Sequence, residues 1–292
     1  MDVSIIIVNY NTLKITNDCI ESVFKKTKNL SYEIILVDNA STDGSREFFT
    51  QDSRIKYVFN ETNIGFGRAN NVGINIAKGR NIIFLNSDTL LCNNAIQILS
   101  TYLDSHPDVA GCGGNLYQQD LSPAYSYGYL FPSLMYEFNF LFFYIPSKLW
   151  YGKNQNHNFT GKAMYVPHIS GANLMIKKEV LEKVGLYNDA FFMYREETEL
   201  CFRIIKSGYK LVNLPNAKII HLEGKSCPID KQLRKAKWMY DSRKTFLRLY
   251  HNTLYVQVAD ILNRLGIYSR IILHSFYRKE YKNYWTTVLK YI

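Results

Sequence analysis

The first hundred residues alternate short apolar runs, rich in β-branched side chains, with segments of helical periodicity. The runs expected to form strands are residues 3–8 (VSIIIV), 33–37, 55–59 and 81–85 (NIIFL). Helical patterns lie between and after them at 12–26, 67–77 and 94–103, and Ser41, Thr42 and Asp43 can cap a further short helix. Strands that are apolar on both faces and joined by helices belong to a parallel sheet covered on both sides. This alternation predicts an α/β fold.

The regular pattern ends after a further expected strand at residues 109–114. Residues 115–166 are loop-like and rich in Tyr, Phe and Trp, and this aromatic density argues against disorder. Regular elements are expected again later, with strands at 169–176 and 218–220 and helices at 178–184 and 196–207. From Cys227 onward the pattern is helical and basic, with an interruption near Gly266. We therefore expect an α/β domain over residues 1–226 and a basic helical region over residues 227–292.

The formal net charge of +10 is concentrated at one end of the chain. Residues 1–224 carry 21 basic and 21 acidic side chains, whereas residues 225–292 carry 14 basic and 4 acidic ones. Such a region suits an anionic membrane surface, where each Lys or Arg contributes about 1 kcal/mol. The alternative is a solvated basic appendage. A nucleic-acid-binding protein would interleave its aromatic and basic residues, which here mostly lie apart.

Targeting signals and cysteine usage favour a cytoplasmic protein. No apolar run approaches the roughly 20 residues that span a bilayer, and the N-terminus shows no signal-peptide pattern. The five cysteines are an odd number without a CxxC pair, which argues against a disulfide framework and a zinc site. We expect reduced thiols and a location at the inner face of the cell membrane.

Polar side chains follow four of the expected strands at the point where each strand ends. They are Asn9-Tyr10-Asn11, Asp38-Asn39-Ala40-Ser41, Asn60-Glu61-Thr62-Asn63 and Asn86-Ser87-Asp88. In open α/β sheets, ligands bind beyond the carboxyl ends of the strands. Any one of these segments is compatible with an ordinary turn, but four together predict a cleft.

These segments and several later ones resemble the inverting glycosyltransferases of family 2, and within them the rhamnosyltransferase-like members. The resemblance covers roughly residues 3–226. It rests on VSIIIVNYN at the start, VDNASTDGS at 37–45, NIGFGRANNVGI at 63–74, FLNSDT at 84–89, ISGANLMIKKEVLEKVGLYNDAFFMYREETELCFRIIKSGY at 169–209 and IIHLEGKS at 219–226. It implies a GT-A fold, which is a Rossmann-like mixed sheet, here with a C-terminal helical extension.

The resemblance implies that residues after the first strands bind a nucleotide-diphosphate sugar. Asp38 matches the aspartate that accepts the ring N–H of uracil or thymine, although a helix N-cap is the alternative. Arg68 would lean toward the base or the diphosphate, with Asn70 nearby. The base would be flanked by Tyr10 and by the backbone of Val8 and Asn9.

The triplet Asn86-Ser87-Asp88 matches the family's DxD motif, which holds a divalent cation, Mg²⁺ or Mn²⁺, on the donor diphosphate. Asp88 would ligate the cation and His221 would complete its shell. Asn86, which replaces the usual first carboxylate, and Ser87 would contact the donor. The alternatives are a strand-end turn for the triplet and a structural role for the lone histidine.

By register, Glu197 matches the general base that takes a proton from the acceptor hydroxyl. Glu196, Gly171 and Ala172 would form the acceptor region around it. Carboxylates close to one another raise each other's pKa, a direction that helps a base. The alternatives are an acidic first helical turn stabilised by the helix dipole and core packing of residues 169–173.

The expected function is transfer of a sugar, with rhamnose favoured, from a dTDP or UDP donor to a glycan or lipid-linked acceptor in polysaccharide synthesis. The aromatic stretch 125–151 suits stacking on sugar rings, an interfacial belt, or ordinary cover for the sheet. A nucleotidyltransferase would carry a glycine-rich phosphate loop where NYNTLK stands. A relative that binds the nucleotide sugar without transferring it is a further alternative.

Overall fold

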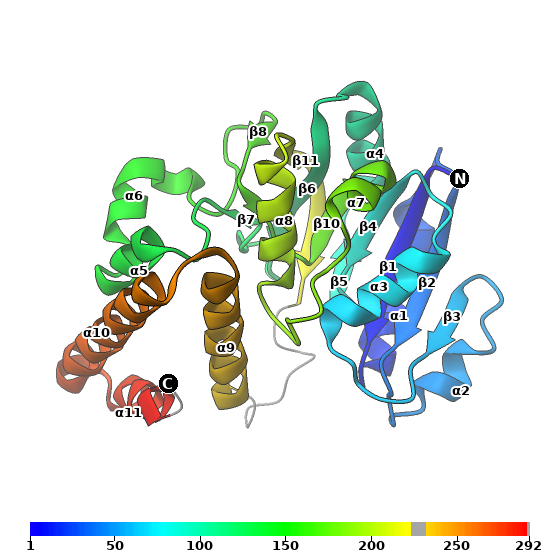
Figure 1. Cartoon of the computed structure of the whole chain (residues 1–292). Helices are drawn as coiled ribbons and strands as arrows, with labels where there is room; N and C mark the ends of the chain where they lie inside the picture. Colours follow the sequence, from blue (N-terminus) through cyan, green and yellow to red (C-terminus); the bar gives the residue numbers. More distant parts are fainter. Residues whose placement is uncertain (223–231, 291–292) are drawn as a thin grey trace.

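A nine-stranded mixed sheet forms the centre of the computed structural model, which describes residues 1–222 and 232–290 (Figure 1). Its strand order is β3-β2-β1-β4-β10-β6-β11-β5, and β8 pairs with β11 outside this path. The strands are β1 (Val3–Asn9), β2 (Tyr32–Asp38), β3 (Lys56–Phe59), β4 (Asn81–Leu85), β5 (Thr89–Leu91), β6 (Val109–Tyr117), β8 (Met164–Tyr165), β10 (Asn173–Lys177) and β11 (Lys210–His221).

The first four strands are parallel, whereas β10 runs antiparallel to both of its neighbours, β4 and β6. The predicted α/β fold is confirmed, as are the first four strands, whose ends lie within one residue of the prediction. Because the sheet is apolar on both sides, alternate residues of one strand pack into different cores. Ile5 and Ile7 of β1 face one core, and Ile6 faces the other.

Helices cover both faces of the sheet. The first core contains residues of α1 (Leu13–Lys26) and α4 (Ala95–Ser105), and α2 (Ser45–Phe49) adds Phe49 to it. The second core contains residues of three other helices, α3 (Phe66–Ile76), α7 (Lys178–Val184) and α8 (Glu196–Lys206), which lie on the opposite face (Figure 1). The predicted helices in this part of the chain are therefore confirmed.

Two expectations for the middle of the chain are corrected by the structure. Residues 115–166 are not a plain loop, since they contain α5 (Leu134–Leu141), α6 (Ile145–Tyr151), a 3₁₀ turn (Gly152–Asn154) and β7 (Tyr127–Gly128). The α5 sequence, LMYEFNFL, is apolar on most sides and so shows no helical stripe. The expected strand 169–176 is two strands, β9 (His168–Ile169), which pairs with β7, and β10, because a turn at 170–172 separates them.

The C-terminal region consists of α9 (Gln232–Tyr250), α10 (Thr253–Tyr277) and α11 (Lys279–Lys290), and α5 packs against α10 (Figure 1). The predicted interruption near Gly266 is wrong, because α10 continues through it. A Cβ at Gly266 would lie 2.6 Å from the Phe140 ring, so glycine serves close packing there. The predicted boundary at 226/227 and Cys227 lie outside the described residues. No helix of the described part is long and apolar enough to cross a bilayer.

A buried ion-pair network joins α5 to the C-terminal helices. Glu137 is fully buried, and its Oε1 accepts a hydrogen bond from Arg243 Nε at 2.5 Å. Asn263 Nδ2 donates to its Oε2 at 2.8 Å, and Arg243 Nη1 pairs with Asp260 Oδ1 at 2.9 Å. Removal of one partner from a buried pair leaves an uncompensated charge.

We expect Glu137→Ala to lower the free energy of unfolding by about 3–5 kcal/mol, because Arg243 loses its closest counter-charge inside the protein. Urea unfolding followed by circular dichroism measures the change. The matched control is Asp108→Ala, which removes an exposed partner of Lys210 and should alter the unfolding midpoint little. An equal effect of the two substitutions would show that the buried network does not anchor α5.

Candidate active site

Asn9, at the end of β1, holds the first two strand-end loops together. Its side chain is fully buried, and its Oδ1 accepts hydrogen bonds from the Thr12 and Thr16 hydroxyls, both at 2.8 Å. Its Nδ2 donates to Ser41 Oγ at 3.0 Å and lies 3.4 Å from Asp38 Oδ2. Tyr10 next to it is 45% exposed and Val8 is half-buried, so at this loop the aromatic ring is the surface offered to a ligand.

Asp38 ends β2 as a fully buried carboxylate. Its Oδ1 accepts from the Ser41 backbone N–H at 2.8 Å, and its Oδ2 accepts from the Tyr57 hydroxyl at 2.9 Å. Burial and this carboxylate raise the pKa of Tyr57 above its ordinary value. The alternative of a helix N-cap is wrong, because α2 begins only at Ser45, whose N–H instead contacts Asp43 Oδ1 at 3.2 Å. No pattern in the sequence indicates Tyr57 as a partner.

The start of α3 packs against the loop that precedes α8. A Cβ at Gly65 would lie 2.5 Å from the Phe192 carbonyl oxygen, and one at Gly67 would lie 3.5 Å from Glu196 Cβ. Arg68 donates to the Asp189 carbonyl at 2.6 and 3.1 Å, so its guanidinium is engaged with that loop. The glycines of GFGRANN therefore permit a close approach of the segment that carries the acid pair.

Asn70 lies one turn further along α3 and is almost fully buried. Its Nδ2 donates to the Phe66 carbonyl at 3.0 Å, and its Oδ1 has no hydrogen-bond partner. The donor-binding roles of Arg68 and Asn70 stay predictions.

The triplet after β4 meets His221 at the end of β11. Asp88 Oδ1 lies 3.1 Å from His221 Nε2, and Asn86 Nδ2 lies 3.4 Å from the same nitrogen. Asp88 and His221 are both largely buried, and Ser87 Oγ lies 3.5 Å from Thr12 Oγ1. Antiparallel pairing of β11 with β5, which sets His221 opposite Thr89, brings these distant segments together.

The Asp88, His221 and Asn86 side chains fit a cation site that is shared with substrate ligands. Within residues 1–222 and 232–290, no group of three or more His, Cys, Asp and Glu side chains could hold a metal ion. Asp88 and His221 supply two ligand atoms, and Asn86 Oδ1 is a buried oxygen without a hydrogen-bond partner. Mg²⁺ sites commonly combine one or two carboxylates with substrate phosphates. The residues present therefore suit a cation held jointly with a diphosphate.

The turn at Gly171 and Ala172 lies between this cluster and the acid pair. Asn86 N–H donates to the Ala172 carbonyl at 3.2 Å. A Cβ at Gly171 would lie 3.4 Å from Cβ and Cγ of Glu197. The segment that carries Asp88 and the side chain of Glu197 therefore both contact this turn. A site shared by Asp88 and Glu197 stays a prediction.

Glu196 and Glu197 begin α8 and differ in environment. Glu196 is 4% exposed and its Oε2 has no hydrogen-bond partner, so burial, and then the charge of Glu197, raise its pKa well above the ordinary value. Burial also raises the pKa of Glu197, but the positive charge of Arg195 opposes the shift. Tyr194 and Arg195 just before them have φ of 68° and 66°, a strain of about 1–3 kcal/mol each for residues other than glycine.

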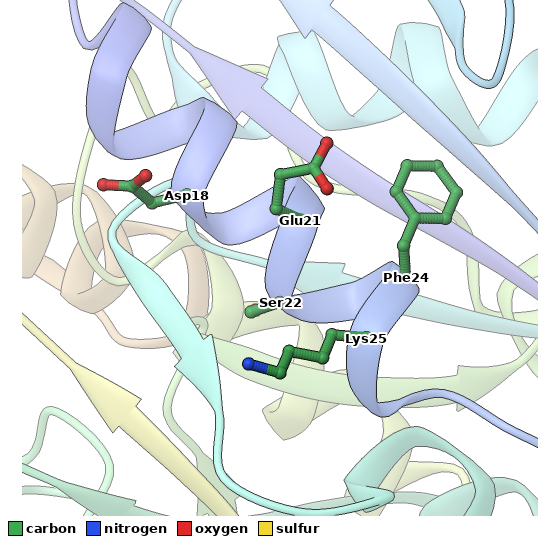
Figure 2. Close-up of a pocket in the computed structure, with 5 residues that line it drawn as sticks. All are labelled: Asp18, Glu21, Ser22, Phe24 and Lys25. Atoms are coloured by element: carbon green, nitrogen blue, oxygen red, sulfur yellow. The ribbon is translucent and has the colours of Figure 1, made fainter.

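Glu197 lines a cavity of about 520 Å³ between α8, α9 and the aromatic stretch. The stretch contributes five of the lining tyrosines, Tyr125, Tyr129, Tyr136, Tyr144 and Tyr151. Part of this stretch therefore forms the wall of a cavity beside the predicted base. A second hollow, on the exposed side of α1, is lined by five residues of that one helix (Figure 2) and contains none of the predicted site residues.

The chain is similar to several named glycosyltransferases. Glycosyltransferase GlyG of Streptococcus pneumoniae serotype 4 is 36% identical over 132 residues, which is 44% of this chain and 43% of that protein. The low-salt glycan biosynthesis hexosyltransferase Agl10 of Haloferax volcanii is 27% identical over 258 residues, 84% of this chain and 75% of that protein. The dTDP-rhamnosyl transferase RfbF of Shigella flexneri is 25% identical over 283 residues, 92% and 87% of the two chains. The match to GlyG thus spans less than half of that relative.

Two solved structures share the fold. The mannosyltransferase PcManGT from Pyrobaculum calidifontis, in complex with GDP-Man and Mn²⁺, has a TM-score of 0.61 at 14% identity and covers 99% of this chain and 84% of its own. GalNAc-T7 with UDP, GalNAc and Mn²⁺ has a TM-score of 0.58 at 18% identity, with coverage of 90% and 54%. The predicted GT-A fold is confirmed. The family model described as glycosyl transferase family 2 matches residues 4–185, more than half of the sequence, and this chain therefore belongs to glycosyl transferase family 2.

Proposed function

We propose that this protein is an inverting glycosyltransferase that moves a sugar from a dTDP or UDP donor to a hydroxyl of a glycan or lipid-linked acceptor. The observation that carries the proposal is the Gly171–Ala172 turn. Its Ala172 carbonyl accepts from Asn86 N–H, two residues before the Asp88 that pairs with His221, and its Gly171 lies against Glu197. A transfer with inversion needs a base on the face of the sugar opposite the leaving group. The proposal assigns the Asp88–His221 pair to the leaving group and Glu197 to the opposite face of the sugar.

Each part of the cleft has a chemical task in this proposal. The Asp38 carboxylate accepts three hydrogen bonds within the protein, and of its roughly four lone-pair sites one is left for the ring N–H of uracil or thymine. A divalent cation bound at Asp88 and His221 would offset negative charge on the departing diphosphate. Glu197 accepts the proton of the acceptor hydroxyl. The hydroxyl oxygen forms a bond to the anomeric carbon, and the bond between that carbon and the donor phosphate oxygen breaks.

Rhamnose is the sugar we favour. The match to the dTDP-rhamnosyl transferase RfbF extends over most of both chains, which supports dTDP-rhamnose as the donor. A role in cell-surface polysaccharide synthesis belongs to the same proposal. An abequosyltransferase of Salmonella typhimurium, RfbV, is 33% identical over 118 residues, and it supports a deoxy sugar more generally.

The two acid residues should separate donor binding from chemistry. We expect Glu197→Gln to lower kcat by about 10²–10⁴-fold with donor binding retained, because only the proton acceptor is lost. Asp88→Ala should instead weaken binding of the nucleotide sugar in the presence of Mn²⁺. Steady-state kinetics and isothermal titration calorimetry measure the two effects, with donor hydrolysis as a readout that needs no acceptor.

The control for these variants is Asp18→Ala, which removes an exposed carboxylate of α1. It should behave like the wild type. A folded Glu197→Gln protein with the wild-type rate would remove Glu197 from the mechanism. Donor binding without any hydrolysis or transfer in the wild type would instead support the relative that binds without catalysis.

The acid pair also predicts a pH dependence. Glu196 has a raised pKa in the folded protein, so the folded state retains a proton that the unfolded chain has lost above its ordinary pKa of about 4.3. Stability linked to this group is therefore present below that pH and is lost as the pH rises through the raised pKa.

We expect Glu196→Gln to be more stable than the wild type at pH 8 and to lose this advantage toward pH 4, since glutamine carries no charge to desolvate. Urea unfolding across that range measures the difference. A pH-independent difference would show that Glu196 is ionised without cost.

We further propose that α10 docks on an anionic membrane surface. Its buried residues lie on one side, and the opposite side carries a stripe of exposed apolar residues at alternating spacings of four and three, namely Leu254, Val258, Ile261, Leu265, Tyr268 and Ile272, extended by Phe276. A helix with such a face lies in the plane of a membrane interface. The excess of 14 basic over 4 acidic residues in 225–292 supports an anionic partner over a neutral one.

We expect Ile261→Asp combined with Ile272→Asp to abolish sedimentation with phosphatidylglycerol-containing vesicles, because both charges would enter the apolar interface. Phe48→Asp, on the exposed surface of α2, is the matched control and should still bind. Binding that persists in the double variant contradicts the proposal. A wild-type dimer that becomes monomeric in the double variant would assign the stripe to a second copy instead.

A further inference from the structure

The cavity beside Glu197 contains a guanidinium without a carboxylate partner. Arg195 donates to the Tyr136 hydroxyl at 3.0 Å and lies over the Tyr136 ring at 4.9 Å. Its Nε is buried and has no hydrogen-bond partner. Among the residues that the structure describes, no carboxylate oxygen lies within 4.0 Å of it.

Three other arginines that are similarly withdrawn from solvent have carboxylate or carbonyl partners. Arg243 pairs with Glu137 and Asp260, and Arg203 pairs with Glu199. Arg270 donates to two backbone carbonyls and stacks on the Phe140 ring. The Arg195 side chain is partly buried, and a guanidinium with an unpartnered buried Nε is costly unless a ligand supplies the opposite charge. Arg243 Nη2 also lacks a hydrogen-bond partner, so Arg195 differs from Arg243 in having no carboxylate within ion-pair distance.

The cavity is otherwise arranged for an anion. Lys148 is its second cation, and Glu197, needed as the base, is its single carboxylate among the lining residues. His168 also lines it with an unpartnered Nδ1, and burial together with the Arg195 charge lowers the pKa of His168 to about 4, which keeps the ring neutral. The volume of about 520 Å³ falls within the roughly 300–1,000 Å³ of small-molecule sites.

We infer that the acceptor of this enzyme carries an anionic group, a phosphate or a carboxylate, that binds Arg195 beside the hydroxyl to be glycosylated. The inference rests on the proposed function, because it assigns the cavity next to Glu197 to the acceptor. The planar guanidinium matches two oxygens of either group. The pairing completes the hydrogen bonding of Arg195 and fixes the acceptor relative to Glu197. Arg195 acts here as a specificity-determining residue.

The test compares the binding of glucose 1-phosphate, glucuronate and glucose to the full chain by isothermal titration calorimetry. EDTA is present and the donor absent, so that a cation site cannot capture the phosphate. We expect the wild type to bind one of the two anionic sugars at least about tenfold more tightly than glucose, equivalent to 1.4 kcal/mol. A preference for glucose 1-phosphate identifies a phosphate acceptor, and one for glucuronate identifies a carboxylate.

Arg195→Gln should abolish the preference, and Arg195→Lys, which retains the charge and guards against a folding defect, should keep part of it. Arg248→Gln removes an exposed cation of α9 and should keep all of it. Asp88→Ala should also keep the preference, since the probes do not occupy the donor site. Equal binding of all three sugars, or a preference that survives Arg195→Gln, overturns the inference. Because no transfer is measured, that result leaves the roles of Asp88 and Glu197 to their own experiment.

Discussion

The antiparallel pairing of β10 with β4 is the contact on which the rest of the site depends. It sets Asn173 opposite Leu85, so the residues just before β10 lie beside the residues just after β4. The chain that follows β10 returns through α7 to α8, which brings Glu197 to the same turn. A strand parallel to β4 at this position would have begun beside the N-terminal end of β4, at the opposite end of the sheet. One reversed strand therefore brings together the segments that carry Asp88 and Glu197.

Several residues near this contact have strained backbone angles or polar atoms without hydrogen-bond partners. Tyr194 and Arg195 adopt left-handed backbone conformations, and Glu196 Oε2, Asn70 Oδ1 and Arg195 Nε lack partners. The central strands of the sheet, by contrast, are buried and largely apolar. Strained residues and unsatisfied polar atoms cluster at functional sites because a rigid scaffold holds them there. Tyr194, Arg195 and Glu196 contribute two of these strained residues and two of these atoms in one segment, although Asn29, Leu121 and Arg243 show such features elsewhere in the described chain.

The parts of the fold that depend on the spacing of apolar residues and on the position of polar residues were predictable from the sequence. VSIIIV and NIIFL have the pattern of buried strands, and the polar residues after them mark the strand ends. The helices of the aromatic stretch were not predictable, because α5 is apolar on most sides, and neither was the continuity of α10 through Gly266, which depends on the distant Phe140 ring. In the site, Glu197 and Asp88 came from motif register. Other features of the site depend on contacts far apart in the sequence. They are the hydrogen bond from Tyr57 to Asp38, the hydrogen bonds from Arg68 to the Asp189 carbonyl, and the Arg195 Nε without a hydrogen-bond partner.

The long helix α10 also restricts which insertions and deletions this protein can tolerate. Its inner side meets Phe140 of the aromatic stretch, and its outer side presents the apolar stripe. Each residue inserted into an α-helix rotates the later turns of that helix by about 100° about its axis. A single inserted or deleted residue near the middle of α10 would therefore misalign both sides at once. The length of this helix is fixed by two surfaces together, so relatives that keep both should vary its side chains while conserving its residue count.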